Sequence, residues 1–375
     1  MRFDKIKKIV IKIGSSSISS LDKGLNRTNL KNLVTGINLL ISKGKQVILV
    51  SSGAISLGLF IDGKKRKPSK LSKLQYAASI GQIELMQAYK KTFQSLNKNI
   101  NIAQILLTSD DLIARERYLN AKNTIQELID HKALPIVNEN DTVSYKEIQF
   151  GDNDLLAATV SNLIEADLLV IFTDQKGLYD ADPTKNKNAK LIAEISIDDQ
   201  RLSVLASSKQ SSSGIGSGGI RSKIIAAETA SRGGAATVIA KGVSKSFFQS
   251  FSDDQIEGTL INPGAAKIKA KQKWMIDNSK SRGILTLDAG AVIALKNHKK
   301  SLLPVGVLKL EGNFVRGDLL KCIDVDGKEV ARGLSNFSSE DAKKIIGKRL
   351  AGQNFELENK IDDNLIHRDN MVIIK

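Results

Sequence analysis

Cysteine and histidine are scarce in this chain of 375 residues. Cys322 is the single cysteine, which excludes a disulfide framework and a cysteine-based metal site, and we expect its thiol to be buried and inert. With only His131, His298 and His367, a catalytic triad or metal site built on histidine has little support. The lack of disulfides is typical of a reducing compartment, so we predict a cytoplasmic location.

Long hydrophobic runs are also missing. The apolar run at residues 9–13 is interrupted by Lys12 and closed by Gly14, so it is too short and too charged for the core of a signal peptide. No other stretch is long enough to span a bilayer. We therefore expect no membrane partner.

Positive charge is abundant but dispersed. The formal net charge is +16, yet the lysines are scattered through every segment, and no long basic run is interleaved with aromatic residues. This pattern predicts a solvated surface rather than a groove for a polyanion, so we do not expect RNA binding. Nucleotide phosphates are the anionic partner that we expect instead.

An α/β domain is predicted for the first two-thirds of the chain, because short β-rich runs alternate there with helical patterns. The expected strands lie at residues 8–13, 46–50, 102–107, 134–137, 168–172 and 237–239. An apolar helical face between the first two strands ends at Gly44, which is typical of a helix C′ position. We predict a mainly parallel sheet with helices on both faces.

A second, mainly β domain is expected after this region, in keeping with a chain too long for one ordinary core. We place the first domain at residues 1–258, a connector at 259–280, the β domain at 281–358 and a tail at 359–375. Asp326 and Gly327 predict a hairpin with a type I′ turn, and one helix is expected near residues 342–346.

The glycine-rich segment at residues 213–223 predicts a phosphate-binding loop. Its four glycines allow backbone N–H groups to turn toward one point, and the helical pattern that follows adds a positive N-terminal end beside Lys223. The segment satisfies GxGxxG, but serines rather than a strand precede it, and Ile220 stands where a Walker loop needs lysine. A flexible Ser/Gly linker is the alternative, and the helix with its lysine argues against it.

Small or polar residues follow the predicted strands, at the sheet edge where open α/β folds bind ligands. They occupy positions 14–17, 51–54, 138–141, 173 and 174. Each group alone could be an ordinary helix cap, whereas their recurrence at one edge favours a site. Lys12 lies near the end of an apolar strand, where its ammonium needs a partner or a phosphate unless the strand is an edge strand.

Asp152 and Asp154 stand at the start of an apolar helix, and Asp174 follows a strand. All three could cap helices. With Lys12 and Lys223 they form a kinase-like set, in which lysines and Mg²⁺ neutralise nucleotide phosphates while acids hold the metal or orient the lysines.

The ordered set of motifs resembles the amino acid kinase family. The motifs are IVIKIGS at 9–15, SSGAI at 51–55, NEND at 138–141, GDND at 151–154, TDQKGLY at 173–179 and GSGGIRSK at 216–223. Residues from about 280 to 358 resemble the PUA domain that many bacterial members carry. The resemblance implies a three-layer αβα sandwich with a mainly parallel central sheet, followed by a small PUA-like domain.

Within the family, the likeness is to the members that phosphorylate glutamate. It implies transfer from ATP, with Mg²⁺ carried by the nucleotide, to the γ-carboxylate of L-glutamate in the first step of proline synthesis. Lys12, Lys223 and Asp154 are the implied catalytic residues, and no protein-held metal is implied. The implied nucleotide-binding residues are Lys12, Thr173, Asp174, Ser217, Gly218, Gly219, Ile220, Arg221, Ser222 and Lys223. Ser52, Asp141 and Asn153 are implied to bind glutamate.

The resemblance further implies a homo-oligomer, feedback by proline near the glutamate pocket, and glutamyl phosphate reductase as a downstream partner. Ser217 and Ser222 stand where threonine is common, and Arg221 adds a cation where a small residue is frequent. Two alternatives stay open at this point. One is a family member acting on acetylglutamate, aspartate or uridylate, and the other is an RNA-binding PUA protein with a disabled kinase domain.

Overall fold

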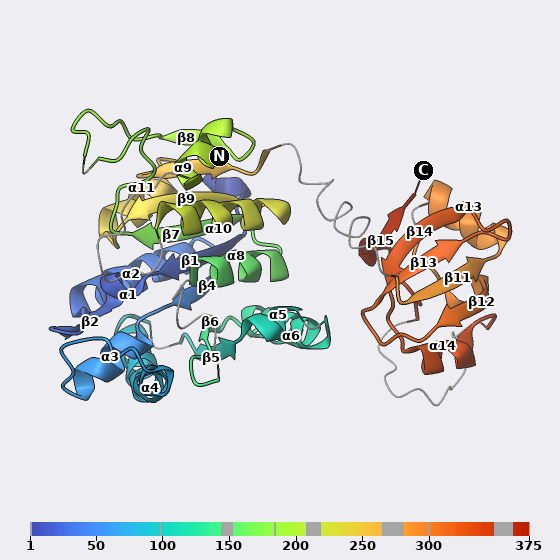
Figure 1. Cartoon of the computed structure of the whole chain (residues 1–375), viewed down its shortest axis with the longest axis horizontal. Coiled ribbons are helices and arrows are strands. Elements are labelled where there is room, and N and C mark those ends of the chain that lie inside the picture. The colour runs from blue at the N-terminus through green and yellow to red at the C-terminus, as the bar shows by residue number, and fades with distance from the viewer. Residues whose placement is uncertain are drawn as a thin grey trace. The chain divides into compact units, whose positions relative to one another are not determined.

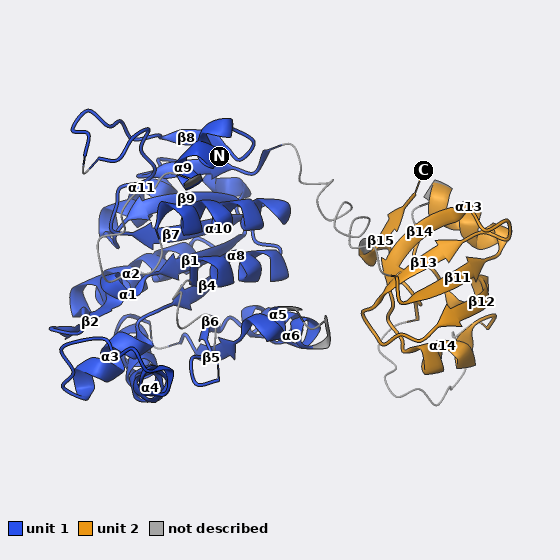
Figure 2. Cartoon of the chain, viewed as in Figure 1, with its two compact units in different colours: residues 1–267 blue, residues 268–375 orange. Residues whose placement is uncertain are grey.

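The computed structural model describes residues 2–97, 99–113, 115–143, 153–183, 185–207, 219–264, 281–298, 300–348 and 363–374. The chain divides into two compact units, residues 1–267 and residues 268–375 (Figure 2). Each unit has its own sheet and its own core, and each is described by itself.

An eight-stranded sheet forms the centre of the first unit (Figure 1). In the order β5-β6-β4-β1-β7-β9-β10-β8, every neighbouring pair is parallel except β9 with β10. The strands are β1 (Lys8–Ile13), β4 (Gln46–Ser51), β5 (Ile102–Leu107), β6 (Leu134–Glu139), β7 (Leu168–Thr173), β8 (Glu194–Ser196), β9 (Ala236–Lys241) and β10 (Thr259–Asn262). The six predicted strands are all present, and β8 and β10 were not predicted.

Helices cover both faces of this sheet and make it the middle of three layers (Figure 1). One core lies between the sheet and α2 (Arg27–Ser42), α4 (Leu71–Leu96) and α11 (Lys245–Ser252). The opposite core packs α6 (Arg115–Asp130), α8 (Asn153–Leu163) and α10 (Ile220–Arg232). The remaining helices of eight or more residues are α3 (Ala54–Ile61) and α9 (Gln200–Ser207), and shorter ones are η1 (Phe3–Lys5), α1 (Ser15–Ile18) and α5 (Ser109–Ile113). The predicted α/β sandwich is confirmed.

Alternation along β1 assigns its side chains to the two cores. Ile9, Ile11 and Ile13 belong to the core under α2, whereas Val10 belongs to the core under α8 and α10. Since strand side chains alternate with a period of two, Lys12 lies on the same face as Val10. The lysine is thereby directed toward α8 and α10.

Helices α3 and α4 touch backbone to backbone. A Cβ added at Gly58 would lie 1.8 Å from the carbonyl oxygen of Ala77, and one added at Gly81 would lie 1.8 Å from that of Ala54. Both contacts are far too short for any side chain. This close approach holds the start of α3, and the turn before it, against α4.

The second unit is built on a five-stranded sheet in the order β12-β11-β13-β14-β15. Its elements are β11 (Gly283–Leu287), α13 (Ala289–His298), η3 (Pro304–Gly306), β12 (Val307–Gly312), β13 (Leu319–Ile323), β14 (Glu329–Leu334), α14 (Ser339–Ile345), η4 (Arg368–Asn370) and β15 (Met371–Ile373). Cys322 is fully buried in its core, and burial raises the pKa of its thiol to about 12, as expected of an inert cysteine. Strand β15 lies in the expected tail and pairs with β14.

Two details of this unit differ from the sequence prediction. Only one helix was predicted here, but the Asp288 carboxylate accepts a hydrogen bond from the Ala291 N–H (2.6 Å) and caps α13, so this unit has a second helix. The predicted hairpin between β13 and β14 is present, but its turn is not type I′. Gly327 has φ +78° whereas Asp326 is not among the residues with positive φ, and a type I′ turn needs positive φ at both.

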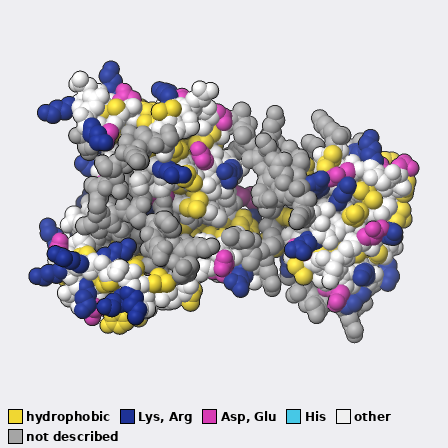
Figure 3. All heavy atoms as spheres, viewed as in Figure 1, with side chains coloured by type: hydrophobic (Ala, Val, Ile, Leu, Met, Phe, Trp, Pro, Cys, Tyr) yellow, Lys and Arg dark blue, Asp and Glu magenta, His cyan; other side chains and the backbone are white. Residues whose placement is uncertain are grey.

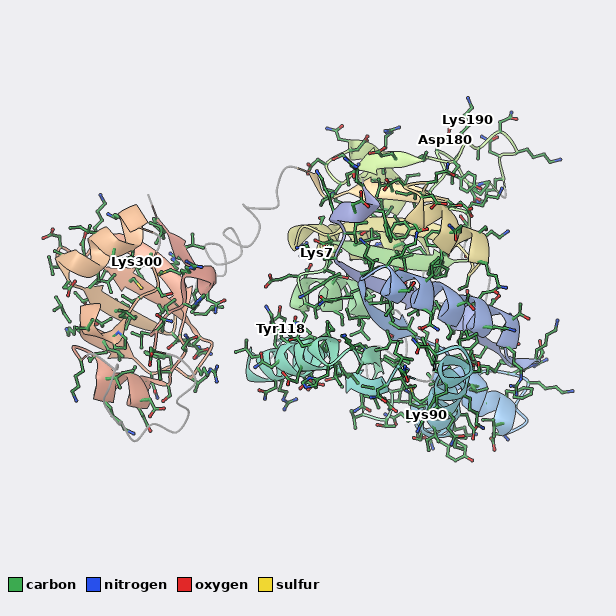
Figure 4. The ribbon with its side chains drawn as sticks, turned by 180° about the vertical axis from the view of Figure 1, so that it is seen from behind. Lys7, Lys90, Tyr118, Asp180, Lys190 and Lys300 are labelled. Atoms are coloured by element: carbon green, nitrogen blue, oxygen red, sulfur yellow. The ribbon has the colours of Figure 1, made fainter. Side chains whose placement is uncertain are left out.

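The surface agrees with dispersed charge. On the face shown in Figure 3, lysine and arginine side chains occur over both units with acidic side chains among them. Lys7, Lys90, Lys190 and Lys300, which are exposed and lie on different segments, illustrate this scatter (Figure 4). Among the described helices, none is both long and apolar enough to cross a membrane.

Candidate active site

The side chains of Lys12 in β1, Asp154 in α8 and Lys223 in α10 meet near the carboxyl end of β1. Asp154 lies in the first turn of α8 and is fully buried, and the two lysines are each 7% exposed. The Lys12 ammonium pairs with Oδ1 of Asp154, and the Lys223 Nζ lies 3.2 Å from Oδ2. Three residues from distant motifs therefore form one buried ionic cluster.

The charges of this cluster stabilise one another. Burial by itself raises the pKa of Asp154, but the ammonium groups of Lys12 and Lys223 outweigh burial and lower that pKa well below the ordinary range. The carboxylate is therefore ionised at neutral pH. Two cations around one anion leave a net positive charge, which suits the binding of phosphate.

Gly14 lies directly after β1, beside the Lys12 ammonium. A Cβ added there would lie 3.9 Å from Nζ of Lys12, so glycine leaves the surroundings of the ammonium open. Lys223 approaches from the first turn of α10, a helix whose N-terminal end carries partial positive charge. Lysine charge and helix dipole both favour an anion at this edge of the sheet.

A buried network of amides lies next to the ionic cluster. Asn153 directs its Nδ2 toward the Ser51 carbonyl oxygen (3.3 Å) and the Asn138 Oδ1 (2.8 Å), and Asn138 donates in turn to Gln82 Oε1 of α4 (2.9 Å). Because a carbonyl oxygen can only accept, Ser51 fixes which way the Asn153 amide points. Both hydrogens of Nδ2 are engaged, so Asn153 offers its oxygen to any ligand.

Asp141 and Ser52 border the same sheet edge. Asp141 follows β6 and is half-buried, and burial raises its pKa to about 6 although nearby Lys67 opposes the rise. The Ser52 N–H donates to the Ile13 carbonyl oxygen (3.1 Å), which places Ser52 beside the end of β1. Ser52 thus follows β4, which pairs with the strand of Lys12, and Asp141 lies beyond the end of β6, which pairs with β4.

Thr173 ends the strand β7, which is adjacent to β1, and its hydroxyl donates to the carboxylate of the next residue, Asp174 (2.9 Å). Gly219 caps α10, Ile220 is half-buried and Arg221 is exposed. Ser217 and Gly218 lie outside the described residues. The structure thus unites the three predicted catalytic residues and places Asn153 next to them.

Sequence reasoning missed two features of this site. Asn138 and Gln82 were not predicted as residues of the site. Asn138 belongs to the NEND motif, which was the only sequence signal that pointed to it. Ser222 was assigned to the nucleotide, but its hydroxyl donates to the Asp154 carboxylate (3.0 Å). Within the described residues no cluster of three or more His, Cys, Asp or Glu could hold a metal ion.

Comparison with known families agrees with the geometry. The pattern of the Amino acid kinase family matches residues 7–241, and that of the PUA domain matches residues 283–352. The chain belongs to the amino acid kinase family. The kinase fold expected for the first unit and the PUA domain expected for the second are both confirmed.

Curated relatives match over nearly the full length of the chain. The glutamate 5-kinase of Chromobacterium violaceum is 45% identical over 367 residues, which is 98% of both chains. That of Pseudomonas putida (strain F1) is 44% identical over 368 residues and 98% of both chains. That of Teredinibacter turnerae is 44% identical over 367 residues, covering 98% of this chain and 97% of the relative.

Proposed function

We propose that this protein transfers the γ-phosphoryl group of ATP to the γ-carboxylate of L-glutamate, giving L-glutamyl 5-phosphate and ADP. The observation that carries the proposal is the buried cluster of Lys12, Asp154 and Lys223 at the carboxyl edge of the sheet. Its two cations suit a phosphoryl group in transfer. The full-length similarity to glutamate 5-kinases supports the choice of acceptor.

Lys12 and Lys223 stabilise the charge that develops on the moving phosphoryl group. In the reaction, a γ-carboxylate oxygen of glutamate forms a bond to the γ-phosphorus while the bond to the β,γ-bridging oxygen breaks, and ADP leaves with that electron pair. Both lysines are held by Asp154 before the substrates arrive, so little reorganisation is needed during transfer. Positioning and charge neutralisation together can supply most of the acceleration of such a reaction.

The acceptor needs no general base. A glutamate side chain has a pKa near 4.3 and is already ionised at neutral pH, which explains how the site can work without histidine. Asp154 is unsuited to proton transfer, because its low pKa keeps it ionised. Its role is to organise the lysines.

Ser52, Asp141 and Asn153 hold glutamate in this proposal. The free hydrogen-bonding group of Asn153 is an acceptor, and the Asp141 carboxylate is another, so the pair matches the α-ammonium of the substrate. An N-acylated glutamate has no ammonium to offer them. The pocket therefore favours free glutamate over acetylglutamate.

The nucleotide lies along Thr173, Asp174, residues 217–221 and Lys223. Mg²⁺ accompanies ATP as part of the substrate, because the carboxylate of Asp154 is already engaged by two lysines and a hydroxyl. When bound, Mg²⁺ screens the phosphate charge of the nucleotide. Proline as inhibitor, a reductase as downstream partner and a homo-oligomeric state remain expectations of the family likeness.

The decisive experiment is an acceptor panel. Purified full-length protein with MgATP is offered L-glutamate, acetylglutamate, L-aspartate and UMP, and both ADP release and the acyl phosphate trapped by hydroxylamine are measured. We expect turnover with glutamate at least about tenfold above each alternative, the value of roughly 1.4 kcal/mol of discrimination. Turnover with another acceptor, or none with any acceptor together with RNA binding that survives high salt, would overturn the proposal.

A further inference from the structure

The Ser222 hydroxyl lies between the catalytic carboxylate and the start of α10. Its Oγ is 3.0 Å from Oδ2 of Asp154 and 2.9 Å from the Gly219 carbonyl oxygen. Lys223, the next residue, reaches the same Oδ2 at 3.2 Å. Two consecutive residues of α10 thus hold one oxygen of a fully buried carboxylate that belongs to α8.

The two neighbours hold Asp154 in different ways. A lysine ammonium is a point charge on a flexible four-carbon stem with three rotatable donors. Its ion pair therefore balances the charge of the carboxylate but restricts the orientation of the carboxylate only weakly. The serine side chain is short and starts from a helix backbone. A hydrogen bond from it restricts the direction of Oδ2, and therefore which oxygen faces Lys12.

A direct hydrogen bond from this hydroxyl to a nucleotide phosphate is unfavourable, because its hydrogen already has acceptors within the protein. A hydroxyl has a single hydrogen, and both acceptors of Ser222 belong to the protein. The carboxylate, being charged, is the stronger of the two acceptors. The lone pairs that are left on Oγ are acceptors, as are the phosphate oxygens of ATP.

We infer that Ser222 is a positioning residue for Asp154 rather than a nucleotide ligand, an inference that rests on the proposed kinase function. Its hydroxyl fixes the carboxylate so that one oxygen holds Lys12 and the other holds Lys223. Through Gly219 the same hydroxyl joins the carboxylate to the first residue of the described part of the predicted nucleotide loop. Positioning of the lysines and order at the start of α10 are therefore coupled.

Three variants of the full-length protein test this role. Ser222→Ala removes the hydroxyl and Ser222→Thr keeps it. Ser231→Ala is a matched control, because the Ser231 hydroxyl on the same helix donates to the Glu228 carbonyl oxygen (2.7 Å), one turn back along α10 and away from Asp154. We expect Ser222→Ala to lower kcat about tenfold, with the Kd of a non-hydrolysable ATP analogue changed by less than about twofold. Ser222→Thr should restore kcat to within about threefold of wild type. Ser231→Ala should match wild type.

A double-mutant cycle separates positioning from a general structural effect. In the Asp154→Asn background, Ser222→Ala should lower kcat by less than about twofold further, because its partner is already altered. The same cycle is measured by thermal unfolding, where Ser222→Ala should lower Tm in the wild-type background and hardly at all in the Asp154→Asn background. Since unfolding does not depend on the reaction, this second cycle measures the coupling between Ser222 and Asp154 even if glutamate proves to be the wrong acceptor.

Three results would overturn the inference. They are a weakened affinity for the ATP analogue with unchanged kcat, additive effects of the two substitutions in both cycles, and wild-type behaviour of Ser222→Ala. If Ser222→Ala does not fold, Ser222→Cys, with its weak S–H donor, takes its place in both cycles, and the same outcomes apply.

Discussion

Asp154→Asn should be the most informative single substitution in this protein. The change keeps the size of the side chain but removes the one negative charge between two buried ammonium groups. Breaking a buried ion pair typically costs about 3–5 kcal/mol, because it leaves an uncompensated charge away from water. Here the substitution leaves two such charges, so we expect the upper part of that range.

This free energy translates into a large change of melting temperature. For a unit of this size, about 2–4 °C of Tm is lost per kcal/mol, so a cost of about 4–5 kcal/mol should make the variant melt roughly 8–20 °C below wild type. The matched control is Glu165→Gln, just after the same helix, whose pair with Lys122 is 2.8 Å long but 67% exposed at the glutamate. An exposed pair is worth about 0.2–1 kcal/mol, so the control should melt within a few degrees of wild type.

The difference in Tm between wild type and Asp154→Asn should depend on pH, because folding lowers the pKa of Asp154. A carboxyl whose pKa is depressed on folding contributes stability above its unfolded pKa of about 3.9, and that stability is lost as pH falls through the folded value. The gap in Tm between wild type and Asp154→Asn should therefore be constant from about pH 6 to 8 and narrow only in acid. Differential scanning calorimetry of the full-length protein measures it.

MgATP provides a second readout, because its phosphates can replace the missing negative charge. We expect the nucleotide to raise the Tm of Asp154→Asn by more than it raises that of wild type, while kcat falls about 100-fold or more. A variant that melts within about 2 °C of wild type, or no lower than the Glu165→Gln control, would refute the assignment of Asp154 as the counter-ion of both lysines.

Five further predictions follow from the site and the fold. Lys12→Ala and Lys223→Ala should each lower kcat about 100-fold with a smaller effect on glutamate affinity, and near-normal turnover in steady-state assays would contradict their roles. Asp141→Asn should raise the KM for glutamate and leave ATP binding intact, as calorimetry with an ATP analogue would check. In wild type the same KM should rise as pH falls through about 6, the raised pKa of Asp141, because protonation removes the partner of the ammonium, and a flat profile from pH 5 to 8 would contradict this. A fragment of residues 1–267 should keep glutamate-dependent turnover because its cores are its own, whereas a folded but inactive fragment would show that the second unit completes the site. Gly58→Ala should lower both stability and glutamate affinity by forcing α3 away from α4, and wild-type values for Tm and KM would be evidence against it.

Much of the fold could be predicted because the parallel strands are buried on both faces. Such strands are nearly continuous apolar runs, and β1, which is buried at five of its six positions, has the predicted bounds. Short strands give a weaker signal. Strand β8 has three residues, and β10 stands just before Pro263 in a segment interpreted as a connector, although both pair in the sheet.

Local sequence also misled where one residue type serves two purposes. Aspartate and glycine near position 288 are typical of a turn, but aspartate is equally a helix cap, and the apolar residues that follow are packed into a core. The hairpin at Gly327 is a second example. The Asp-Gly pair predicts a turn, but the sequence does not show whether one or both of the two residues will have a positive φ, which decides the turn type.

The three residues of the buried ionic cluster could be found from the sequence, but their contacts could not. Lys12, Asp154 and Lys223 each stand at the end of a strand or the start of a helix, where local pattern is strong. The bond from Ser222 to Asp154 spans 68 positions and the bond from Asn138 to Gln82 spans 56, and both depend on how helices pack on the sheet. No local pattern encodes such a distance.

The face on which Lys12 lies depends on its apolar neighbours more than on the lysine itself. Ile9, Ile11 and Ile13 are buried in the core under α2, and this fixes the face of every side chain in β1. A slip of one residue would turn the three isoleucines toward α8 and place the ammonium in the opposite core, among apolar side chains and away from Asp154. Such a slip would remove hydrophobic burial and ion pairing together. The packing that stabilises the sheet is therefore also what sets the lysine opposite its carboxylate.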